Sequence, residues 1–315
     1  MDRTSGSGQS PPHSVICRAG APADAGPAAR LIVTALNDVL SKQNRAPTTS
    51  SHGALVPVLE HLAKGAGRFW VAADGEDLVG MGTSLVRGEL WFLSALFVLP
   101  QWQGAGVGRA LLEHAMDGYP AAGGVAAVMS SAANPLSNRL YAHHGLWPLM
   151  PVLYLSGAPA RVVAPHTSSF TSSPLSVDHL DDLRAVDLGV TGLDRTPDHA
   201  WLMEVAGRPG WLFRRHGRPA GYAYLGGDGT QGDDAVGPVA TLRAQDQAAA
   251  IGFALAEAAR RGHATATLAV PGLNLCAQRL LWQAGFAFEG AAALFGASRP
   301  FGRFDRYIFF GDSLM

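Results

Sequence analysis

The chain has 315 residues, of which 48% are hydrophobic and 16% are charged, so it is long and apolar enough for two globular domains with a sizeable core. A formal net charge of −1 argues against a nucleic-acid-binding protein, which needs a basic surface. The two cysteines, Cys17 and Cys276, lie far apart, which argues against a metal site of paired cysteines and fits free thiols in the cytoplasm.

The first copy of an α/β unit can be followed in chain order. Residues 1–13 are polar, lack the apolar stretch of a secretory signal, and are expected to form a disordered tail. Residues 90–108 carry no charge, but Pro100 and three glycines interrupt them, so a buried strand is expected rather than a membrane span. Periodicity predicts helices over 24–41, 53–65, 105–117 and 135–144, a hairpin over 68–86, and strands over 90–98, 124–130 and 147–156.

The sequence then repeats itself at an offset of 140 residues. NPLSNRLYAHHGL (134–146) aligns without a gap to NLCAQRLLWQAGF (274–286), and RFWVAADGEDLVGMG (68–82) resembles GWLFRRHGRPAGYA (210–223). Two copies of one α/β unit are therefore predicted, over residues 14–156 and 175–315. Residues 157–174 have the Pro, Ser and Thr content of a linker.

A glycine-rich segment, QGAGVGR (103–109), separates the strand at 90–98 from the helix at 105–117. The N-terminus of a helix presents unpaired N–H groups and a positive dipole end, and glycines let an anion such as a diphosphate approach the backbone. A Rossmann loop would need glycine in place of Arg109, and a P-loop would need a Gly-Lys pair, which the chain lacks. A glycine turn without a ligand is the alternative.

Two motifs carry a family resemblance. Gln103-x-x-Gly106-x-Gly108 resembles the acetyl-CoA signature Q/R-x-x-G-x-G/A of the GNAT superfamily of N-acetyltransferases. The second GNAT pattern, N-x-x-[AS]-x-x-x-Y-x-x-x-G-[FL], is matched by Asn134, Ser137, Tyr141, Gly145 and Leu146. The resemblance covers residues 14–156 well and residues 175–315 in outline. It implies an α/β fold of two tandem GNAT-like domains, each a mixed, mostly antiparallel sheet flanked by helices.

The resemblance implies direct acetyl transfer from acetyl-CoA, as cosubstrate and without a metal, to a primary amine of a small molecule or peptide. The strands at 92–98 and 124–130 would splay apart to admit the thioester. The implied cofactor-binding positions are Leu96, Phe97, Val98, Gln103, Gly104, Ala105, Gly106, Val107, Gly108, Arg109, Ala110, Asn134 and Ser137. A helix cap is the alternative for Asn134, and a solvated surface residue is the alternative for Arg109.

By the same resemblance Tyr141 is the general acid, with core packing as its alternative. Glu89 is the acid nearest the strand at 90–98 and is the candidate general base, although a lone Glu at a turn is usually just solvated. The candidate acceptor-binding residues are Asn37, Asp38 and Gln43, with an ordinary helix-surface carboxylate as the alternative for Asp38.

The second copy lacks the features of the first. It has no glycine between Gly237 and Gly252, it places Asp246 near the expected diphosphate position, and Leu281 replaces the tyrosine. It is therefore expected to be a degenerate pseudo-domain, and the chain a monomer that mimics a dimer, or a homodimer. The leading hypothesis is a cytoplasmic N-acetyltransferase that binds neither nucleic acid nor membrane. The alternative is a non-catalytic CoA-binding sensor or scaffold.

Overall fold

The computed structural model describes residues 15–42, 44, 46–48, 51–65, 68–119, 124–163, 170–227 and 233–315. The expected disordered tail and the acceptor candidate Gln43 lie outside these residues.

The first unit contains the elements expected from the sequence, each within two residues of its predicted bounds. They are α1 (Ala25–Lys42), α2 (His52–Lys64), β2 (Phe69–Asp74), β3 (Asp77–Arg87), β4 (Leu90–Val98), α3 (Val107–Met116), β5 (Val125–Ser131), α4 (Pro135–His143) and β6 (Trp147–Gly157). A further strand, β1 (Val15–Ala19), precedes them and pairs with β2.

The second unit has the same succession of elements. They are β7 (Phe170–Pro174), α5 (Leu180–Val190), α6 (Thr196–Glu204), β8 (Gly210–Arg215), β9 (Arg218–Leu225), β10 (Val236–Thr241), α7 (Gln247–Arg260), β11 (Ala266–Pro271), α8 (Leu275–Gln283), β12 (Ala287–Ala297) and β13 (Tyr307–Ile308). The predicted α/β class, with mixed sheets flanked by helices, is confirmed. The expected linker is shorter than predicted, because residues 170–174 form β7 and pair with β8.

The repeat is visible in how the two equivalent helices begin. Asn134 caps α4 by accepting a hydrogen bond from the N–H of Ser137, and Asn274 caps α8 by accepting one from the N–H of Ala277. Helix α8 has the bounds of α4 shifted by 140 residues, and β12 likewise has the bounds of β6. The same local signal therefore starts the same helix twice.

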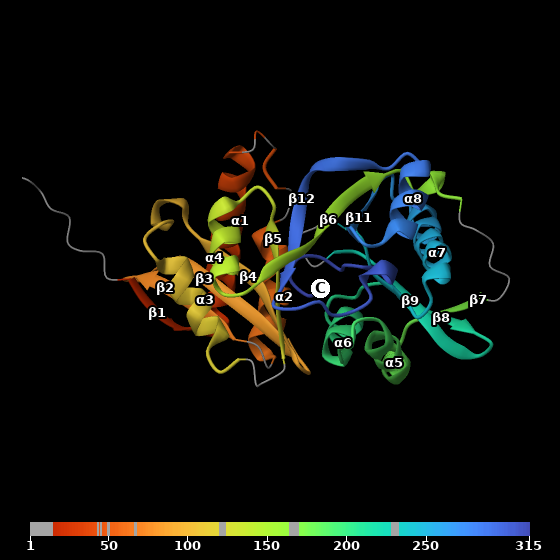
Figure 1. Ribbon diagram of the computed structural model, residues 1–315, viewed down its shortest axis with the longest axis horizontal. Helices are drawn as coiled ribbons and strands as arrows, with labels where there is room; N and C mark the ends of the chain where they lie inside the picture. Colours follow the sequence, from red (N-terminus) through yellow and green to blue (C-terminus); the bar gives the residue numbers. More distant parts are fainter. Residues whose placement is uncertain are drawn as a thin grey trace, which may run out of the picture.

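The two units exchange their last long strands. The larger sheet has the order β1-β2-β3-β4-β5-β12-β6-β11, so β12 of the second unit lies between β5 and β6, and β6 reaches across to β11. Strands β6 and β12 pair antiparallel in the middle of the molecule (Figure 1). The predicted units are thus two sequence copies that share one sheet. The smaller sheet, β13-β10-β9-β8-β7, belongs to the second unit alone.

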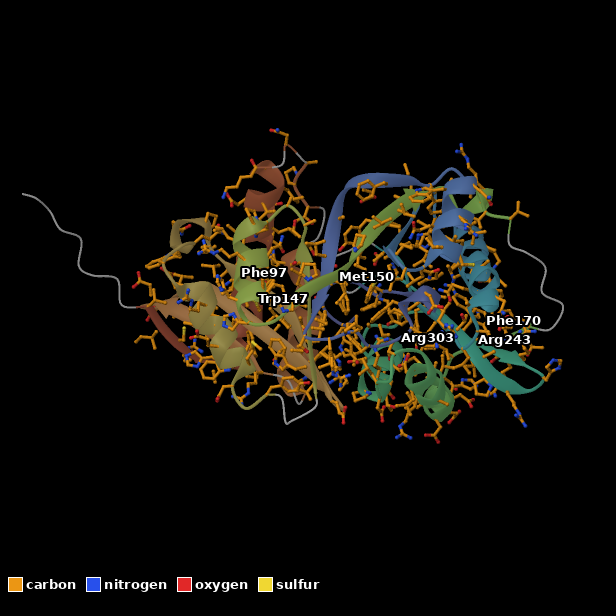
Figure 2. The ribbon with its side chains drawn as sticks, in the orientation of Figure 1. Phe97, Trp147, Met150, Phe170, Arg243 and Arg303 are labelled. Carbon is orange, nitrogen blue, oxygen red and sulfur yellow. The ribbon has the colours of Figure 1, made fainter. Side chains whose placement is uncertain are left out.

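A buried core also joins the two units. It includes Leu62 of α2 and Phe92 of β4 from the first unit, together with Leu202 of α6 and the segment around Phe309 from the second. Met150 of β6, another member of this core, lies between the two halves in Figure 2. No helix among the described residues is long and apolar enough to cross a membrane.

An ionic cluster lies where α2 and β3 meet α6. The guanidinium of Arg87 donates to Asp198 through Nε at 2.9 Å, and the Nε2 atom of His61 lies 2.9 Å from the other oxygen of the same carboxylate. Asp198 and Arg87 are both buried. Burial alone would raise the pKa of Asp198, but hydrogen bonds from His61 and Arg87 outweigh it and hold that pKa well below its ordinary value.

Candidate active site

The parallel strands β4 and β5 separate partway along their length. They pair from Leu90↔Val125 to Leu93↔Val128, and β4 then continues to Val98 with β3 as its partner on the other side only. At the point of separation Ser94 is left over as a bulge, because Ser84 pairs with Leu93 and Thr83 pairs with Ala95. The bulge bends β4 away from β5, so the sheet opens here, as the resemblance implied.

The glycine loop lies at the far end of this opening. Gly104 and Gly106 have φ angles of 82° and 88°, a left-handed conformation that favours glycine, and nothing lies within 4 Å of where a Cβ would be. The N–H groups of residues 104–109 have no acceptor among the described residues. Because α3 begins at Val107, these groups belong to the N-terminus of that helix and to the loop that precedes it. The loop therefore fits a diphosphate.

Two side chains flank the loop in different ways. The Nε2 atom of Gln103 donates to the carbonyl oxygen of Val98 at 3.0 Å, which ties the loop to the end of β4. Arg109 is exposed on the first turn of α3, where its charge adds to the positive end of the helix dipole. Leu96, Phe97 and Val98 are partly buried along the β4 edge that faces the opening.

Tyr141 lies at the start of the opening. Its ring belongs to a buried cluster with Leu93 and Val128, the last paired residues of β4 and β5. Its hydroxyl has no hydrogen-bond partner among the described residues, and burial raises the pKa of Tyr141 well above its ordinary value. The tyrosine is thus both a core residue and a protonated group that is free to donate. It also lines a small hollow, to which β12 of the second unit contributes Leu294 and Gly296.

The side chains of Asn134 and Ser137 are engaged in starting α4. The Oδ1 atom of Asn134 accepts from the N–H of Ser137 at 3.2 Å, and the Ser137 hydroxyl donates to the carbonyl oxygen of Asn134. Residues that line the hollow beside Tyr141 were missed by the sequence analysis. The amide of Asn138 accepts a hydrogen bond from the Ser130 hydroxyl at 2.7 Å and so joins α4 to β5.

The structure does not bring Glu89 to Tyr141. Glu89 is exposed at the turn before β4, and its carbonyl oxygen accepts from the N–H of Val125 at the closed end of the strand pair. Four residues of extended chain, about 13 Å, separate it from Leu93, where the opening begins. The role of general base is therefore not supported for Glu89. The position matches the solvated turn residue that was its alternative.

The two described acceptor candidates have local partners. The Oδ1 atom of Asn37 accepts from the N–H of Thr48 at 2.9 Å, which holds the segment between α1 and α2. Asp38 forms an ion pair with Lys42 one helical turn away, with 2.6 Å between Oδ2 and Nζ. Asp38 is thus paired along the surface of its own helix, as its alternative reading stated.

The corresponding place in the second unit is filled by the chain itself. Strands β10 and β11 are linked directly only by a bridge between Ala235 and Thr267. Strand β13 pairs with β10, and Phe309 then forms a bridge with Ala269 of β11. Residues 307–309 therefore lie between β10 and β11, where the first unit has its opening.

The second loop also differs in charge and shape from the first. Asp246 is buried at the start of α7 and forms an ion pair with Arg215. Leu281, fully buried, takes the position that Tyr141 has in the first unit. A carboxylate at the helix start disfavours an anionic ligand there.

Comparison with known proteins agrees with this geometry. Residues 34–146 match the model of the Acetyltransferase (GNAT) family. The first unit therefore carries a GNAT-family domain over these residues. No curated protein matches the sequence. The described ranges hold no group of three His, Cys, Asp or Glu side chains placed to hold a metal ion.

Solved structures share the whole two-unit architecture of this chain. A candidate acetyltransferase from Pyrococcus horikoshii is 14% identical, has a TM-score of 0.71, and covers 99% of each chain. A GCN5-related N-acetyltransferase from Sphaerobacter thermophilus is 20% identical, with a TM-score of 0.62, over 92% of this chain and 97% of that one. A tandem GNAT protein from the clavulanic acid biosynthesis pathway is 17% identical, with a TM-score of 0.59, over 91% and 99%. At such identities the likeness establishes the tandem fold.

Proposed function

We propose that this protein is an acetyl-CoA-dependent N-acetyltransferase that transfers the acetyl group directly to a primary amine of a small molecule or peptide. One observation carries the proposal. The sheet of the first unit opens beyond Leu93 and Val128. A loop of N–H groups and the hydroxyl of Tyr141 flank this opening, and neither has a hydrogen-bond partner among the described residues. The opening would admit the thioester, the loop would bind the diphosphate, and the Tyr141 hydroxyl would donate a proton.

The backbone supplies the binding. The N–H groups of residues 104–109 would hold the diphosphate, because they combine unpaired donors with the positive end of α3. The edge of β4 from Leu96 to Val98 would pair with the amide groups of pantetheine as an added strand does. The thioester then reaches the opening, where it is accessible from both faces of the sheet.

Tyr141 would supply the proton. A neutral amine attacks the thioester carbonyl and a C–N bond forms. The C–S bond then breaks, and the departing thiolate takes the proton of the Tyr141 hydroxyl. The nitrogen releases its extra proton to solvent, from which Tyr141 is protonated again. Because burial keeps the pKa of Tyr141 high, this hydroxyl is protonated at neutral pH and available for that step. Direct transfer needs no covalent enzyme intermediate, which agrees with the lack of a nucleophile in the glycine loop.

The second unit would not bind the cosubstrate. Residues 307–309 fill its strand gap, Asp246 occupies the helix start, and leucine replaces the tyrosine at position 281. We propose that it is a pseudo-domain that supports the first unit through the exchanged strands. The chain as a whole then has one acetyl-transfer site.

The test is a thiol-release screen of the purified chain with acetyl-CoA against polyamines, aminoglycosides, amino acids and peptides. Release of CoA with at least one amine, together with acetylation of that amine by mass spectrometry, supports the transferase. The alternative function, a non-catalytic CoA-binding sensor, predicts acetyl-CoA binding without amine-dependent release across the whole panel.

A further inference from the structure

Residues 309–315, here called the C-terminal segment, form a loop whose two ends are tied together in the second unit. The hydroxyl of Tyr307, just before the segment, donates to the carbonyl oxygen of Met315 at 2.6 Å. Arg195, itself buried, donates to the hydroxyl of Tyr307 and, through Nη2, to the carbonyl oxygen of Leu314 at 3.2 Å. The segment is therefore anchored at both ends by the same pair of side chains.

Asp312 lies at the turn of this loop. Of residues 307–315, all of which the structure describes, it alone is not buried. Figure 1 shows this end of the chain in the middle of the molecule, between the two halves. The C-terminal segment thus presents one acidic side chain, that of Asp312, between the two units.

The Asp312 carboxylate contacts the first unit at Tyr154 of β6. The Tyr154 hydroxyl donates to Oδ1 of Asp312 at 2.5 Å and lies 4.0 Å from the sulfur of Met129. Met129 is on β5, one residue beyond Val128, where the pairing with β4 ends. Asp312 and Met129 thus contact the same Tyr154 hydroxyl, which places the carboxylate near the first residue of β5 beyond its pairing with β4.

Asp312 and Tyr141 lie on opposite faces of the sheet. Successive strand residues face opposite sides, so Val128 packs with Tyr141 whereas Met129 and Tyr154 pack on the core that joins the two units. The opening between β4 and β5 runs from one face to the other. In acetyl transfer the base acts on the nitrogen and the acid on the sulfur, which are separate atoms of the tetrahedral intermediate, so the two groups can lie on different faces of the sheet.

We propose that Asp312 is the acceptor-site carboxylate: it attracts the ammonium form of the amine and takes its proton. The proposal rests on the proposed function. The proton passes from the amine nitrogen to Asp312, and the nitrogen lone pair forms the C–N bond. The C–S bond then breaks, and the thiolate takes the Tyr141 proton. The second proton that the nitrogen loses on becoming an amide returns through solvent to Tyr141. A small amine cation is the substrate class that a partly buried carboxylate selects.

Other acids around the first unit are engaged or remote. Asp38 is paired with Lys42, Asp198 is paired with Arg87, and Glu89 lies at the closed end of the strand pair. Asp312 is itself engaged by Tyr154, but it differs from these acids in its place near Met129 of β5, and it comes from the second copy. This gives the pseudo-domain a direct part in the reaction.

The experiment compares the full-length wild type with Asp312→Asn, Asp312→Glu and Tyr154→Phe. The control is Asp305→Asn, an acid-to-amide change outside the loop at a residue that pairs with Arg306. Thiol release is measured with the amine that the wild type acetylates best, from mildly acidic to mildly basic pH, and acetyl-CoA binding is measured by calorimetry.

We expect Asp312→Asn to lower kcat/KM for the amine by roughly 100-fold, the usual contribution of a general base, with acetyl-CoA affinity unchanged. In the wild type, kcat/KM should fall toward acidic pH because both the amine and Asp312 take up protons. In Asp312→Asn only the amine contributes to this fall, and in Asp312→Glu the contribution of the carboxylate should return. Tyr154 is a positioning residue, so Tyr154→Phe should reduce kcat more than it changes the KM for acetyl-CoA. Asp305→Asn should behave as wild type.

Wild-type kcat/KM and an unchanged pH profile in Asp312→Asn would overturn the proposal while leaving the transferase intact. If Asp312→Asn does not fold by circular dichroism, Tyr154→Phe decides, and wild-type kinetics in that variant would overturn the proposal. A wild type that releases no CoA with any amine refutes the transferase, and the role of Asp312 with it.

Discussion

Leu93 of β4 and Val128 of β5 are the last paired residues of two parallel strands that diverge beyond them. The bulge at Ser94, the glycine loop after Val98 and the ring of Tyr141 are all placed relative to this pair. Acetyl transfer at this site requires that divergence, because a thioester can lie between two strands only where they do not hydrogen-bond to each other.

The two glycines of the acetyl-CoA motif should respond differently to alanine. Gly106 has a φ of 88°, and an L-residue in that conformation costs about 1–2 kcal/mol, so Gly106→Ala should weaken acetyl-CoA binding about tenfold. Gly108 does not have a positive φ, and a Cβ there would lie 3.7 Å from the Val98 side chain, an ordinary contact. Gly108→Ala is therefore the matched control. Calorimetric titration measures both, and equal affinities in the two variants would contradict a backbone cradle at Gly106.

We expect no fall of kcat/KM at moderately basic pH that is caused by ionisation of Tyr141. Burial raises the pKa of this tyrosine well above its ordinary value, so the acid form persists through neutral and moderately basic pH. The amine loses its own proton as pH rises, so kcat/KM should climb and then level off. Steady-state thiol release across this range is the measurement. A decline near the ordinary tyrosine pKa of about 10 that disappears in Tyr141→Phe would show instead that the pKa is not raised.

Much of the first unit follows from local signals in the sequence. Strand β4 was predicted with its observed bounds, because an uninterrupted apolar run ends at Pro100, and α4 begins at a capping Asn before Pro135. No local sequence signal of this kind predicts the exchange of β6 and β12 between the units. Both strands come from equivalent positions of the repeat, so neither sequence specifies which copy of the neighbouring strand it will join. The pattern fixes a strand but not its partner.

The same reason accounts for the candidate site. The glycine loop and Tyr141 belong to one continuous stretch with recognisable spacing. Asp312 and Tyr154 lie 158 residues apart and become neighbours only through the exchanged strands. Glu89, the base candidate suggested by proximity in sequence, lies at the closed end of the strand pair.

The interface between the units should depend on Asp198. Its carboxylate is paired with buried Arg87, so Asp198→Ala should lower the free energy of unfolding by about 3–5 kcal/mol, because it leaves an uncompensated buried cation. The exposed pair between Arg208 and Asp233 provides the control, and Asp233→Ala should cost at most about 1 kcal/mol. Urea unfolding at neutral pH measures both. Similar losses of unfolding free energy in the two variants would show that the ionic cluster of Asp198 does not stabilise the interface between the units.

The Asp198 contribution should also disappear in acid. Its pKa is lower in the folded protein than in the unfolded chain, so the stabilisation is complete above the unfolded value of about 4. Below that pH the unfolded chain takes up the proton first, and the stability difference between wild type and Asp198→Ala should shrink. Urea midpoints compared at neutral and acidic pH test this. A difference that stays constant as the pH falls would contradict the lowered pKa.

Acetyl-CoA should bind once per chain. The gap of the second unit holds residues 307–309, and its helix start carries Asp246 paired with Arg215, so no equivalent anion site exists among its described residues. Calorimetry should give a stoichiometry of one. A stoichiometry of two would mean that the second unit is not a pseudo-domain.

The most direct test of the account is the turnover of Tyr141→Phe beside its acetyl-CoA affinity. The hydroxyl has no described hydrogen-bond partner, so its removal should leave folding and acetyl-CoA binding unchanged. It should lower kcat by roughly 100-fold or more, because the thiolate loses its proton donor. Wild-type kcat in a folded, acetyl-CoA-binding Tyr141→Phe protein would contradict the central claim that this tyrosine is the acid of an acetyltransferase.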